Sequence, residues 1–327
     1  MNDLRSIVER FKEKRVVVFG DLVADVFLYG EISRISREAP VLILNHRETQ
    51  VVPGGGANAI HNLWALGAKP VPVGLVGEDA EGQQLLEYFS TVGIDISGIR
   101  VAKSYRTPTK MRILAGAVHS QRQQIVRLDS GGPIQEEKTR NGIEQKLKLA
   151  LNHADALLIS DYGYALVTPE IVSRIRKNSI PATIDSRFSL LSFSNMTAAT
   201  PNEPEVEAAM ATSIGNDANK LESAGRTLLR KLQHNALLIT RGKQGMALFE
   251  RGKKTVHIPI YGSDEIADVT GAGDTVIATF TLALAAGASY YDAARLANYA
   301  GGIVVMKYGT RPVTYEELMK AVEQDSK

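Results

Sequence analysis

Short runs of apolar residues alternate with amphipathic stretches along most of the chain. The runs are rich in Val, Ile or Leu and end at glycine or a polar residue, a pattern typical of strands buried on both faces. We expect such strands at 15–19, 71–76, 156–160, 182–185 and 236–240, with strand pieces at 246–250 and 254–259. Between them, apolar positions recur every three to four residues, as on one face of a helix. We expect helices at 3–13, 57–66, 80–92, 135–151, 168–178, 217–233, 290–306 and 314–324, and a short helix beginning near 205. This alternation predicts an α/β fold in which helices cover both faces of a mostly parallel sheet.

Two segments depart from this alternation because they contain strand patterns with no helix between them. In the first, 26–52, we expect strands at 41–44 and 49–52. In the second, 99–130, we expect strands at 110–114 and 124–129. Two such excursions from a parallel sheet predict a second, small sheet that folds over the site as a lid, built from about 22–52 and 99–130.

One glycine-bearing motif near the C-terminus has the properties of an anion site. Asp268-Val-Thr-Gly-Ala-Gly-Asp274 precedes an apolar run at 275–286 that is long enough for about three helical turns. We therefore expect a loop that becomes a helix between Gly271 and Asp274. The first N–H groups of a helix lack internal partners, and the helix dipole favours negative charge there, so Gly271, Ala272 and Gly273 can bind a phosphoryl group. A carboxylate beside that anion, Asp274, is either a general base or simply an N-cap.

Other polar residues follow predicted strands, where parallel sheets bind their ligands. Asp21 and Asp25 come after the first strand and are placed to hydrogen-bond a polyol, although Asp25 could equally be a solvated loop acid. Three consecutive glycines, Gly54 to Gly56, form a loop that opens a helix, and such a run favours close approach to a ligand. Asn58 lies in the first turn of that helix, where it could bond sugar hydroxyls.

Composition narrows the class of protein. The 327 residues suffice for one large α/β domain, and 44% hydrophobic and 23% charged residues are ordinary for a globular protein. The net charge of +2, from 38 basic and 36 acidic residues, gives no electrostatic case for binding nucleic acid or a membrane. There is no cysteine, and the six histidines are not spaced as metal ligands. The chain has no apolar run near the ~20 residues of a bilayer span and begins without a signal core, so we expect a cytoplasmic protein.

The motifs, taken in order, resemble those of the ribokinase-like (PfkB) sugar kinases. They are the Gly-Gly-Gly-Ala-Asn loop, an Asn-x-x-Glu at 202–205, a Thr-x-Gly after a late strand, and Asp-x-Thr-Gly-Ala-Gly-Asp. The resemblance covers essentially the whole chain, and the last motif is the most specific. It implies a single ribokinase-like domain over 1–327, a three-layer sandwich with a β-sheet lid. A dinucleotide-dependent oxidoreductase is excluded, because the first strand leads to Gly20-Asp21 and not to a Gly-x-Gly-x-x-Gly turn.

The resemblance also implies roles for matching positions. Asp274 would be the catalytic base, with the anion hole at Gly271, Ala272 and Gly273. Asn202 and Glu205 would orient the phosphates of ATP and hold Mg2+ through water. Thr240, Gly242 and Asn298 would line the nucleotide site, and Asp268 and Thr270 match positions that bind a monovalent cation, with K+ the expected ion. The sugar would be bound by Asp21, Gly55, Gly56 and Asn58.

Within this family, two stretches look like the heptose-phosphate kinase, which in many bacteria is one half of a bifunctional kinase and adenylyltransferase. The first is Gly20 to Gly30 followed by Ser33 to Val41, and the second is Thr107 to Arg112 together with Gln124 to Asp129. The chain ends after the kinase motifs, so we expect no adenylyltransferase domain. The heptose kinases tend to have Asp-Pro-Lys where this chain has Asp185-Ser186-Arg187, which keeps the positive charge but changes its shape.

The expected substrates are therefore ATP and a phosphosugar. A sugar that already carries a phosphate needs basic residues, and the candidates, each of which alone could be a solvated side chain, are Arg34, Lys110, Arg112, Arg127 and Arg187. Two alternatives stay open: a kinase of the same family acting on ribose, fructose or a nucleoside, and a non-catalytic ligand-binding protein on the same fold. A strand-built lid with apolar edges also predicts a homodimer.

Overall fold

A nine-stranded sheet forms the centre of the molecule. The computed structural model describes residues 3–116, 122–176, 179–262, 268–307 and 309–325. The strand order is β13-β12-β11-β10-β9-β8-β1-β4-β5, and all neighbours are parallel except around β12, which is antiparallel to β11 and β13. The bounds are β1 Arg15–Gly20, β4 Lys69–Gly77, β5 Ile99–Ala102, β8 Ala156–Asp161, β9 Ala182–Ser186, β10 Ala198–Ala199, β11 Ala236–Thr240, β12 Met246–Glu250 and β13 Val256–Ile258.

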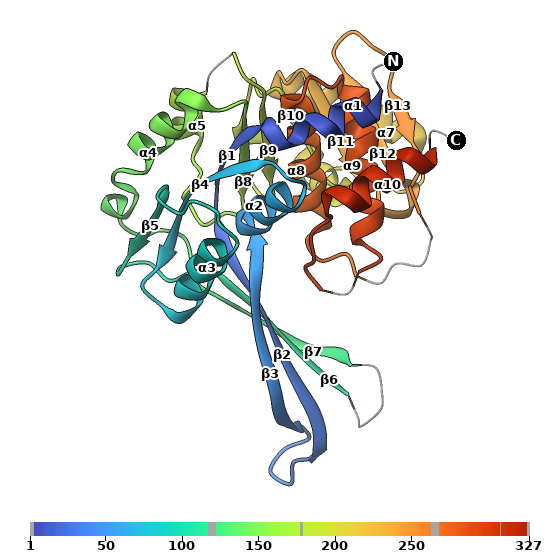
Figure 1. Cartoon of the computed structure of the whole chain (residues 1–327). Helices are drawn as coiled ribbons and strands as arrows, with labels where there is room; N and C mark the ends of the chain where they lie inside the picture. The colour runs from blue at the N-terminus through green and yellow to red at the C-terminus, as the bar shows by residue number, and fades with distance from the viewer. Residues whose placement is uncertain (1–2, 117–121, 177–178, 263–267, 308, 326–327) are drawn as a thin grey trace.

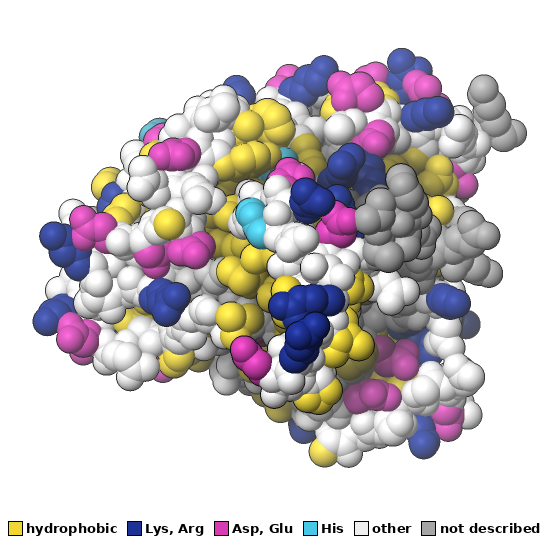
Figure 2. Space-filling model, turned by 90° about the horizontal axis from the view of Figure 1, so that it is seen from below, with side chains coloured by type: hydrophobic (Ala, Val, Ile, Leu, Met, Phe, Trp, Pro, Cys, Tyr) yellow, Lys and Arg dark blue, Asp and Glu magenta, His cyan; other side chains and the backbone are white. Residues whose placement is uncertain are grey.

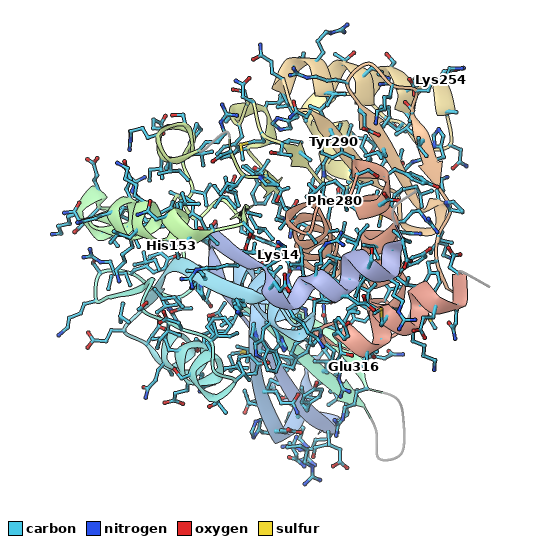
Figure 3. The ribbon with its side chains drawn as sticks, turned by 45° about the horizontal axis from the view of Figure 1, so that its top comes forward. Lys14, His153, Lys254, Phe280, Tyr290 and Glu316 are labelled. Carbon is cyan, nitrogen blue, oxygen red and sulfur yellow. The ribbon has the colours of Figure 1, made fainter. Side chains whose placement is uncertain are left out.

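Helices cover both faces of this sheet (Figure 1), as the sequence predicts. One face packs against α1 Leu4–Glu9, α2 Gly56–Ala65, α3 Ala80–Thr91, α8 Ala272–Ala285, α9 Tyr290–Val304 and α10 Tyr315–Asp325. The other packs against α4 Ile143–Ala150, α5 Pro169–Ile175, α6 Glu203–Met210 and α7 Ala218–Leu232. Side chains of β1 alternate between the two cores, with Val16 and Val18 in the first and Val17 and Phe19 in the second. Phe280 of α8, labelled in Figure 3, is fully buried in the first core.

A smaller four-stranded sheet projects from the body of the molecule (Figure 1). Its strand order is β3-β2-β6-β7, and its bounds are β2 Leu22–Ile35, β3 Leu42–Gly55, β6 Thr109–Gly116 and β7 Gln123–Ser130. β2 pairs with β3 in an antiparallel hairpin and with β6 in parallel. The second sheet is thus present where the sequence predicts one. The strands predicted at 41–44 and 49–52 form one continuous strand, because the pairing with β2 continues through the exposed polar residues between them.

Three further predictions need correction. Residues 99–102 of the predicted lid segment form β5, which extends the main sheet beside β4, and residues 117–121 of that segment lie outside the described residues. The helix predicted over 135–151 begins only at Ile143, because Gly142 is left-handed (φ 81°) and separates α4 from the 3-10 turn Glu137–Arg140. The two-residue strand β10 has no counterpart among the predicted strands, since two residues are too short to show a period.

Most of the other predicted elements are confirmed, with shifts of one to four residues at their ends. Residues 177–178 of the helix predicted at 168–178 lie outside the described residues. Among the helices that the structure describes, none has the combination of length and apolar character that crossing a bilayer requires.

Candidate active site

Two adjoining cavities lie where the carboxyl ends of the central strands meet the N-terminus of α8. One, of about 200 Å³, is lined by acidic side chains from β8, β9 and α6 and by Asp274. The other, of about 320 Å³, is mostly apolar and lies between β12, α8 and α9. They share four lining residues, Asn202, Thr240, Val269 and Gly273. A polar chamber joined to an apolar one suits a ligand with a charged end and a flat apolar end.

The helix α8 begins as predicted, directly after a left-handed glycine. Gly271 has φ 78°, and a Cβ at this position would lie 2.5 Å from Nδ2 of Asn58. Only glycine therefore permits both the turn and the close approach of α2. The amide of Ala272 donates to the carbonyl oxygen of Val269 (3.2 Å), so of the three predicted anion-hole residues this one has an internal acceptor. Gly271 and Gly273 line the acidic cavity.

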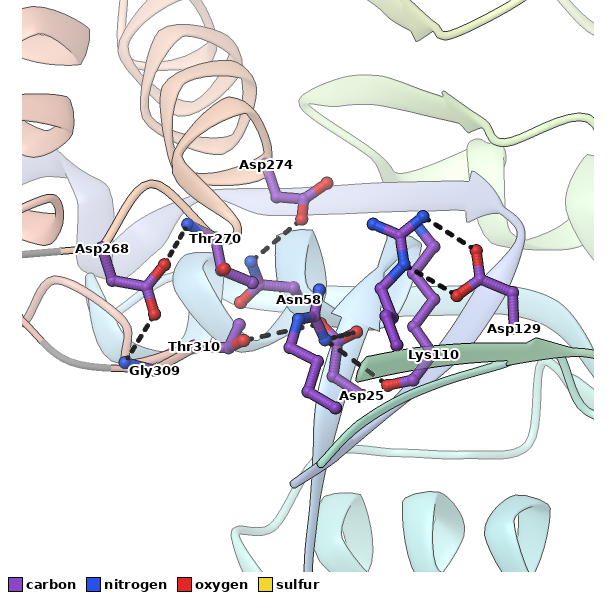
Figure 4. Close-up of polar contacts among 11 residues, drawn as sticks. Asp25, Asn58, Lys110, Asp129, Asp268, Thr270, Asp274, Gly309 and Thr310 are labelled. Atoms are coloured by element: carbon purple, nitrogen blue, oxygen red, sulfur yellow. Dashed lines mark hydrogen bonds and ion pairs between the residues drawn. The ribbon is translucent and has the colours of Figure 1, made fainter. Parts of the chain in front are cut away.

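Asp274, in the first turn of α8, is 3% exposed and held by two donors. Asn58 Nδ2 donates to one carboxylate oxygen (3.0 Å), as Figure 4 shows, and the hydroxyl of Tyr162 donates to the other (2.8 Å). Burial raises the pKa of Asp274 to about 6, and the two hydrogen bonds oppose this rise. The carboxylate is not an N-cap, since Gly271 occupies that position. A buried carboxylate that titrates near neutrality has the properties of a general base.

The structure places Asn58 beside Asp274 in a buried network on α2. Its amide also donates to the carbonyl oxygen of Gly271 (3.3 Å), and its side-chain oxygen accepts from Asn62 Nδ2 (3.1 Å). The hydroxyl of Thr275 in turn donates to the side-chain oxygen of Asn62 (3.0 Å). Asn58 is fully buried, so its amide orients Asp274.

The glycines before α2 end a strand, where the sequence predicts a loop. Gly54 and Gly55 complete β3, and Gly55 adopts φ 54°. A Cβ on Gly56 would lie 2.9 Å from the carbonyl oxygen of Asp21, and one on Gly54 would lie 2.7 Å from a carboxylate oxygen of Asp25. The close approach that the glycine run favours is thus made by the end of β1 and the start of β2.

Asp21, predicted to contact the sugar, is 1% exposed. One carboxylate oxygen accepts from the backbone amides of Tyr162 (2.8 Å) and Tyr164 (3.2 Å), while the other is buried without a hydrogen-bond partner among the described residues. Burial raises the pKa of Asp21 to about 7. Its contacts show that Asp21 joins the ends of β1 and β8.

Asp25 is also buried, at 5% exposure, and is therefore not the solvated loop acid that the sequence left open. It accepts from Arg112 (2.7 Å) and, as Figure 4 shows, from the hydroxyl of Thr310 (3.4 Å). Its interaction with Asp274 contributes to the raised pKa of that residue. Asp25 therefore belongs to the site, between the small sheet and α8.

The five candidate cations fall into three groups. Arg112 is paired with Asp25, and Arg127 makes a bidentate pair with Asp129 (2.9 and 3.0 Å). Lys110 lies over the ring of Tyr162 (4.5 Å to the centroid), and Arg187 lines the acidic cavity. In the part of the chain that the structure describes, neither of these two has a carboxylate within 4 Å. Arg34 lies at the exposed end of β2, about 30 Å along the strand from Asp25, so the structure does not bring it to the site.

The Asn-x-x-Glu motif forms the N-terminus of α6. Asn202 caps the helix by accepting from the amide of Glu205 (2.9 Å), and Glu205 accepts from the amide of Asn202 (2.9 Å). Both line the acidic cavity together with Asp161 and Asp185. Burial raises the pKa of Glu205, and burial together with the charges of Glu205 and Asp274 raises the pKa of Asp185 well above its usual range.

The predicted nucleotide residues line the apolar cavity. Thr240 ends β11 and Gly242 follows it, while Asn298 of α9 donates to the carbonyl oxygen of Pro259 (2.8 Å). In the loop before α8, both carboxylate oxygens of Asp268 accept backbone amides, from Thr270 (2.9 Å) and Gly309 (3.1 Å; Figure 4). No three His, Cys, Asp or Glu side chains converge as a metal cluster in the described ranges.

Sequence reasoning missed Tyr162, and it assigned no role to Asp161 or Asp185. The two acids end predicted strands, so the rule that ligands bind at strand ends could have selected them. Tyr162 carries no signal of its own, because only the fold brings its hydroxyl to Asp274.

Comparison with known proteins identifies a family. The profile described as pfkB family carbohydrate kinase matches residues 13–317. The bifunctional protein HldE of Coxiella burnetii (strain Dugway 5J108-111) is 37% identical over 97% of this chain, and that of Geobacter sulfurreducens is 40% identical over 93%. The chain spans 65% and 62% of the length of these two relatives.

Solved structures confirm the fold. Phosphofructokinase-2 from Escherichia coli, in complex with fructose-6-phosphate, superimposes with a TM-score of 0.77 at 18% identity, covering 96% of this chain and all of that one. Arabidopsis thaliana ribokinase, complexed with ribose and ATP, gives 0.72 at 21% identity, covering 95% and 98%. The sheet order, the glycine-started helix that presents Asp274, and the family match over nearly the whole chain lead to one conclusion: the chain belongs to the pfkB family of carbohydrate kinases.

Proposed function

We propose that the chain is an ATP-dependent kinase that phosphorylates the anomeric hydroxyl of D-glycero-D-manno-heptose 7-phosphate, giving the 1,7-bisphosphate that ADP-heptose and lipopolysaccharide core synthesis require. Asp274 carries the proposal: it is a buried carboxylate at the start of α8, with a pKa raised to about 6, beside a cavity that adjoins an apolar pocket. The motifs shared with the heptose-phosphate kinases and the similarity to HldE proteins support the choice of sugar.

In the proposed reaction, adenine occupies the apolar cavity beside Asn298, and the γ-phosphate of ATP reaches Gly273. Asp274 takes the proton of the sugar hydroxyl, whose oxygen attacks the γ-phosphorus as the bond to the β–γ bridging oxygen breaks, leaving ADP. Backbone amides at the start of α8 stabilise the charge that develops on the phosphoryl oxygens.

Glu205 and Asp185 are the residues that would face Mg2+, in the case of Glu205 through water. Their raised pKa values reflect buried negative charge that a divalent cation would relieve, so the acidic cavity fits the ion. Bound there, Mg2+ would neutralise charge on the β- and γ-phosphates. For K+, we propose the loop of Asp268 and Thr270, where the carboxylate oxygens also accept the amides of Thr270 and Gly309.

Lys110 and Arg187 are the best-placed cations for anionic groups of the substrates. Lys110 comes from β6 of the small sheet, and Arg187, which lines the acidic cavity, follows β9 of the main sheet. Burial lowers the pKa of Lys110, and the neighbouring charge of Arg187 adds to this lowering, so an anion between them would be bound strongly. We propose that the small sheet acts as a lid that brings Lys110 to the site and excludes water.

A panel of acceptors tests the proposed function. The purified chain, with Mg2+ and ATP, is assayed for ADP release with heptose 7-phosphate, heptose, ribose, fructose and a nucleoside, and 31P NMR identifies the phosphorylated position. Turnover with heptose 7-phosphate should exceed that with every unphosphorylated sugar, and the product should carry an anomeric phosphate. Preference for an unphosphorylated acceptor would replace the proposed substrate, and nucleotide binding without any turnover would show a ligand-binding protein.

A further inference from the structure

We propose that Tyr162 is a positioning residue for Asp274: its hydroxyl fixes the orientation of the carboxylate and favours the ionised form, and its backbone is locked in place by Asp21. The proposal rests on the proposed function, because it assumes that Asp274 is the base. It also gives Asp21, which lines neither of the two cavities described above, a role in the site.

The loop that carries Tyr162 has an unusual conformation that is fixed by many contacts. Gly163 and Ala165 both have positive φ, 82° and 62°, which for alanine is a strained conformation. One carboxylate oxygen of Asp21 accepts the amides of Tyr162 and Tyr164, and a carboxylate oxygen of Asp161 accepts that of Gly163 (3.0 Å). A strained loop persists only when its surroundings determine it, so these carboxylates hold the backbone of Tyr162 in one place.

The far end of the loop is held as well. The carbonyl oxygen of Tyr164 accepts from the amide of Ile134 (3.0 Å), and that of Ala165 accepts from Arg140 (3.2 Å). The loop from Asp161 to Ala165 thus has hydrogen bonds at both ends. The backbone that carries the Tyr162 ring is therefore held by contacts within the protein itself.

The side chain of Tyr162 contacts both Asp274 and a cation. Its hydroxyl donates to Asp274 at 2.8 Å, and Nζ of Lys110 lies 4.5 Å from the ring centroid. Desolvation, and then the charge of Asp274, raises the pKa of Tyr162 well above its usual range, so the hydroxyl keeps its proton and remains a donor. The charged groups that face Asp274 from other elements are Asp25 of β2, Lys110 of β6 and Asp185 of β9.

Removing the hydroxyl of Tyr162 should shift the pKa of Asp274 in a predictable direction. A hydrogen bond donated to a carboxylate stabilises its ionised form. Tyr162 donates one of the two hydrogen bonds that lower the pKa of Asp274 and so oppose the effect of burial. In Tyr162→Phe, the pKa of Asp274 should therefore rise. Because a general base acts only when ionised, kcat/KM should fall about fivefold more at pH 6 than at pH 8.5. A purely structural loss would lower the rate equally at both values.

The test measures the titration of Asp274 in the full chain by NMR, with aspartate labelled with 13C at the side-chain carboxyl and the Asp274 signal assigned by its absence in Asp274→Asn. Tyr162→Phe should move the midpoint to higher pH. Site-specific replacement of Tyr162 by 3-fluorotyrosine, a stronger donor of nearly the same shape, should move it to lower pH. The matched control is Tyr164→Phe, which removes a hydroxyl from the same loop that has no hydrogen bond to Asp274 and should leave the midpoint unchanged.

The proposal would be overturned if the titration midpoint of Asp274 stayed at its wild-type value in both Tyr162 variants. It would also be overturned if Tyr164→Phe moved this midpoint as far as Tyr162→Phe does. The NMR measurement needs no acceptor, so it separates this inference from the choice of sugar. If the wild-type chain turns over no acceptor but the midpoints move as expected, the proposed function fails while the positioning of Asp274 by Tyr162 stands.

Discussion

At the scale of the single residue, Asp274 combines two properties that oppose each other. It is buried, which disfavours its charge, and it must be ionised to accept a proton. The sequence identified it because a short contiguous motif determines its local structure. Tyr162 and the actual contacts of Asp21 and Asn58 could not be predicted, because each depends on residues more than a hundred positions away.

The pH dependence of the rate follows from this residue. The pKa of Asp274 is raised to about 6, so the base is protonated and inactive below that pH and ionised above it. We expect kcat/KM for the phosphosugar to rise with unit slope up to about pH 6 and then level off, as measured by initial rates across pH 5 to 8. An acid limb near pH 4 would show that the carboxylate involved is a solvent-exposed one.

The burial of Asp274 should also make the stability of the folded protein depend on pH. The folded-state pKa of Asp274 lies above the unfolded value, so its contribution to stability is present below about pH 4 and is lost as the pH rises through about 6. Asp274→Asn removes this loss, because its side-chain oxygen can accept from Asn58 while its NH2 group donates to the hydroxyl oxygen of Tyr162. The free energy of unfolding at pH 8 should therefore increase by about 1–3 kcal/mol, with little change at pH 4.

Urea unfolding of the two proteins at the two pH values checks this expectation. The difference between wild type and variant isolates Asp274 from Asp21, whose burial acts in the same direction. A variant that is less stable than wild type at pH 8 would contradict the burial of an uncompensated charge.

At the scale of elements, the sequence predicts most helices and strands of the main sheet because their apolar periods are strong and their ends carry glycine or proline. The failures have local causes: Gly142 divides a helix, β10 is too short to show a period, and β2 and β3 are long strands with exposed polar stretches. The site was predictable where one helix start defines it, at α8. It was not predictable where separate loops converge.

The start of α8 can be tested by comparing two left-handed glycines. Gly271→Ala would place a Cβ 2.5 Å from Asn58 Nδ2, whereas Gly287→Ala, after the end of the same helix, meets no atom within 4 Å. Both substitutions cost about 1–2 kcal/mol for the backbone conformation. Only Gly271→Ala should also displace Asn58 from Asp274.

We therefore expect Gly287→Ala to lower the melting temperature with kcat unchanged. Gly271→Ala should lower both, with kcat reduced by at least about tenfold, the effect of misplacing a catalytic group. Thermal melting and initial rates measure the two effects, and equal kcat values in the two variants would show that the contact between α2 and α8 has no bearing on catalysis.

At the scale of the whole molecule, the small sheet exposes large apolar side chains. Figure 2, seen from the side of this sheet, shows hydrophobic and basic side chains close together. The exposed apolar residues of the sheet are Ile35, Leu42, Ile125, Val126 and Leu128, with Val41 in the turn between β2 and β3. An apolar sheet with the free edge strand β7 is a surface that another chain can cover.

We propose that two copies of the chain cover this sheet in a homodimer. Sedimentation velocity should show a dimer at micromolar concentration, and Leu128→Lys (55% exposed) should shift it toward monomer. The matched control, Leu149→Lys, changes a similarly exposed leucine (63%) on α4 and should leave the dimer intact. A wild-type chain that sediments as a monomer across this range would contradict the proposed dimer.

The most direct measurement is the turnover of Asp274→Asn beside its affinity for Mg·ATP, determined by calorimetry on the same preparation. With the acceptor that the wild-type chain prefers, kcat should fall by at least about a hundredfold, the contribution of a positioned general base, while the dissociation constant for Mg·ATP stays within about threefold of wild type. Turnover at the wild-type rate would show that Asp274 accepts no proton and that the site works by another group.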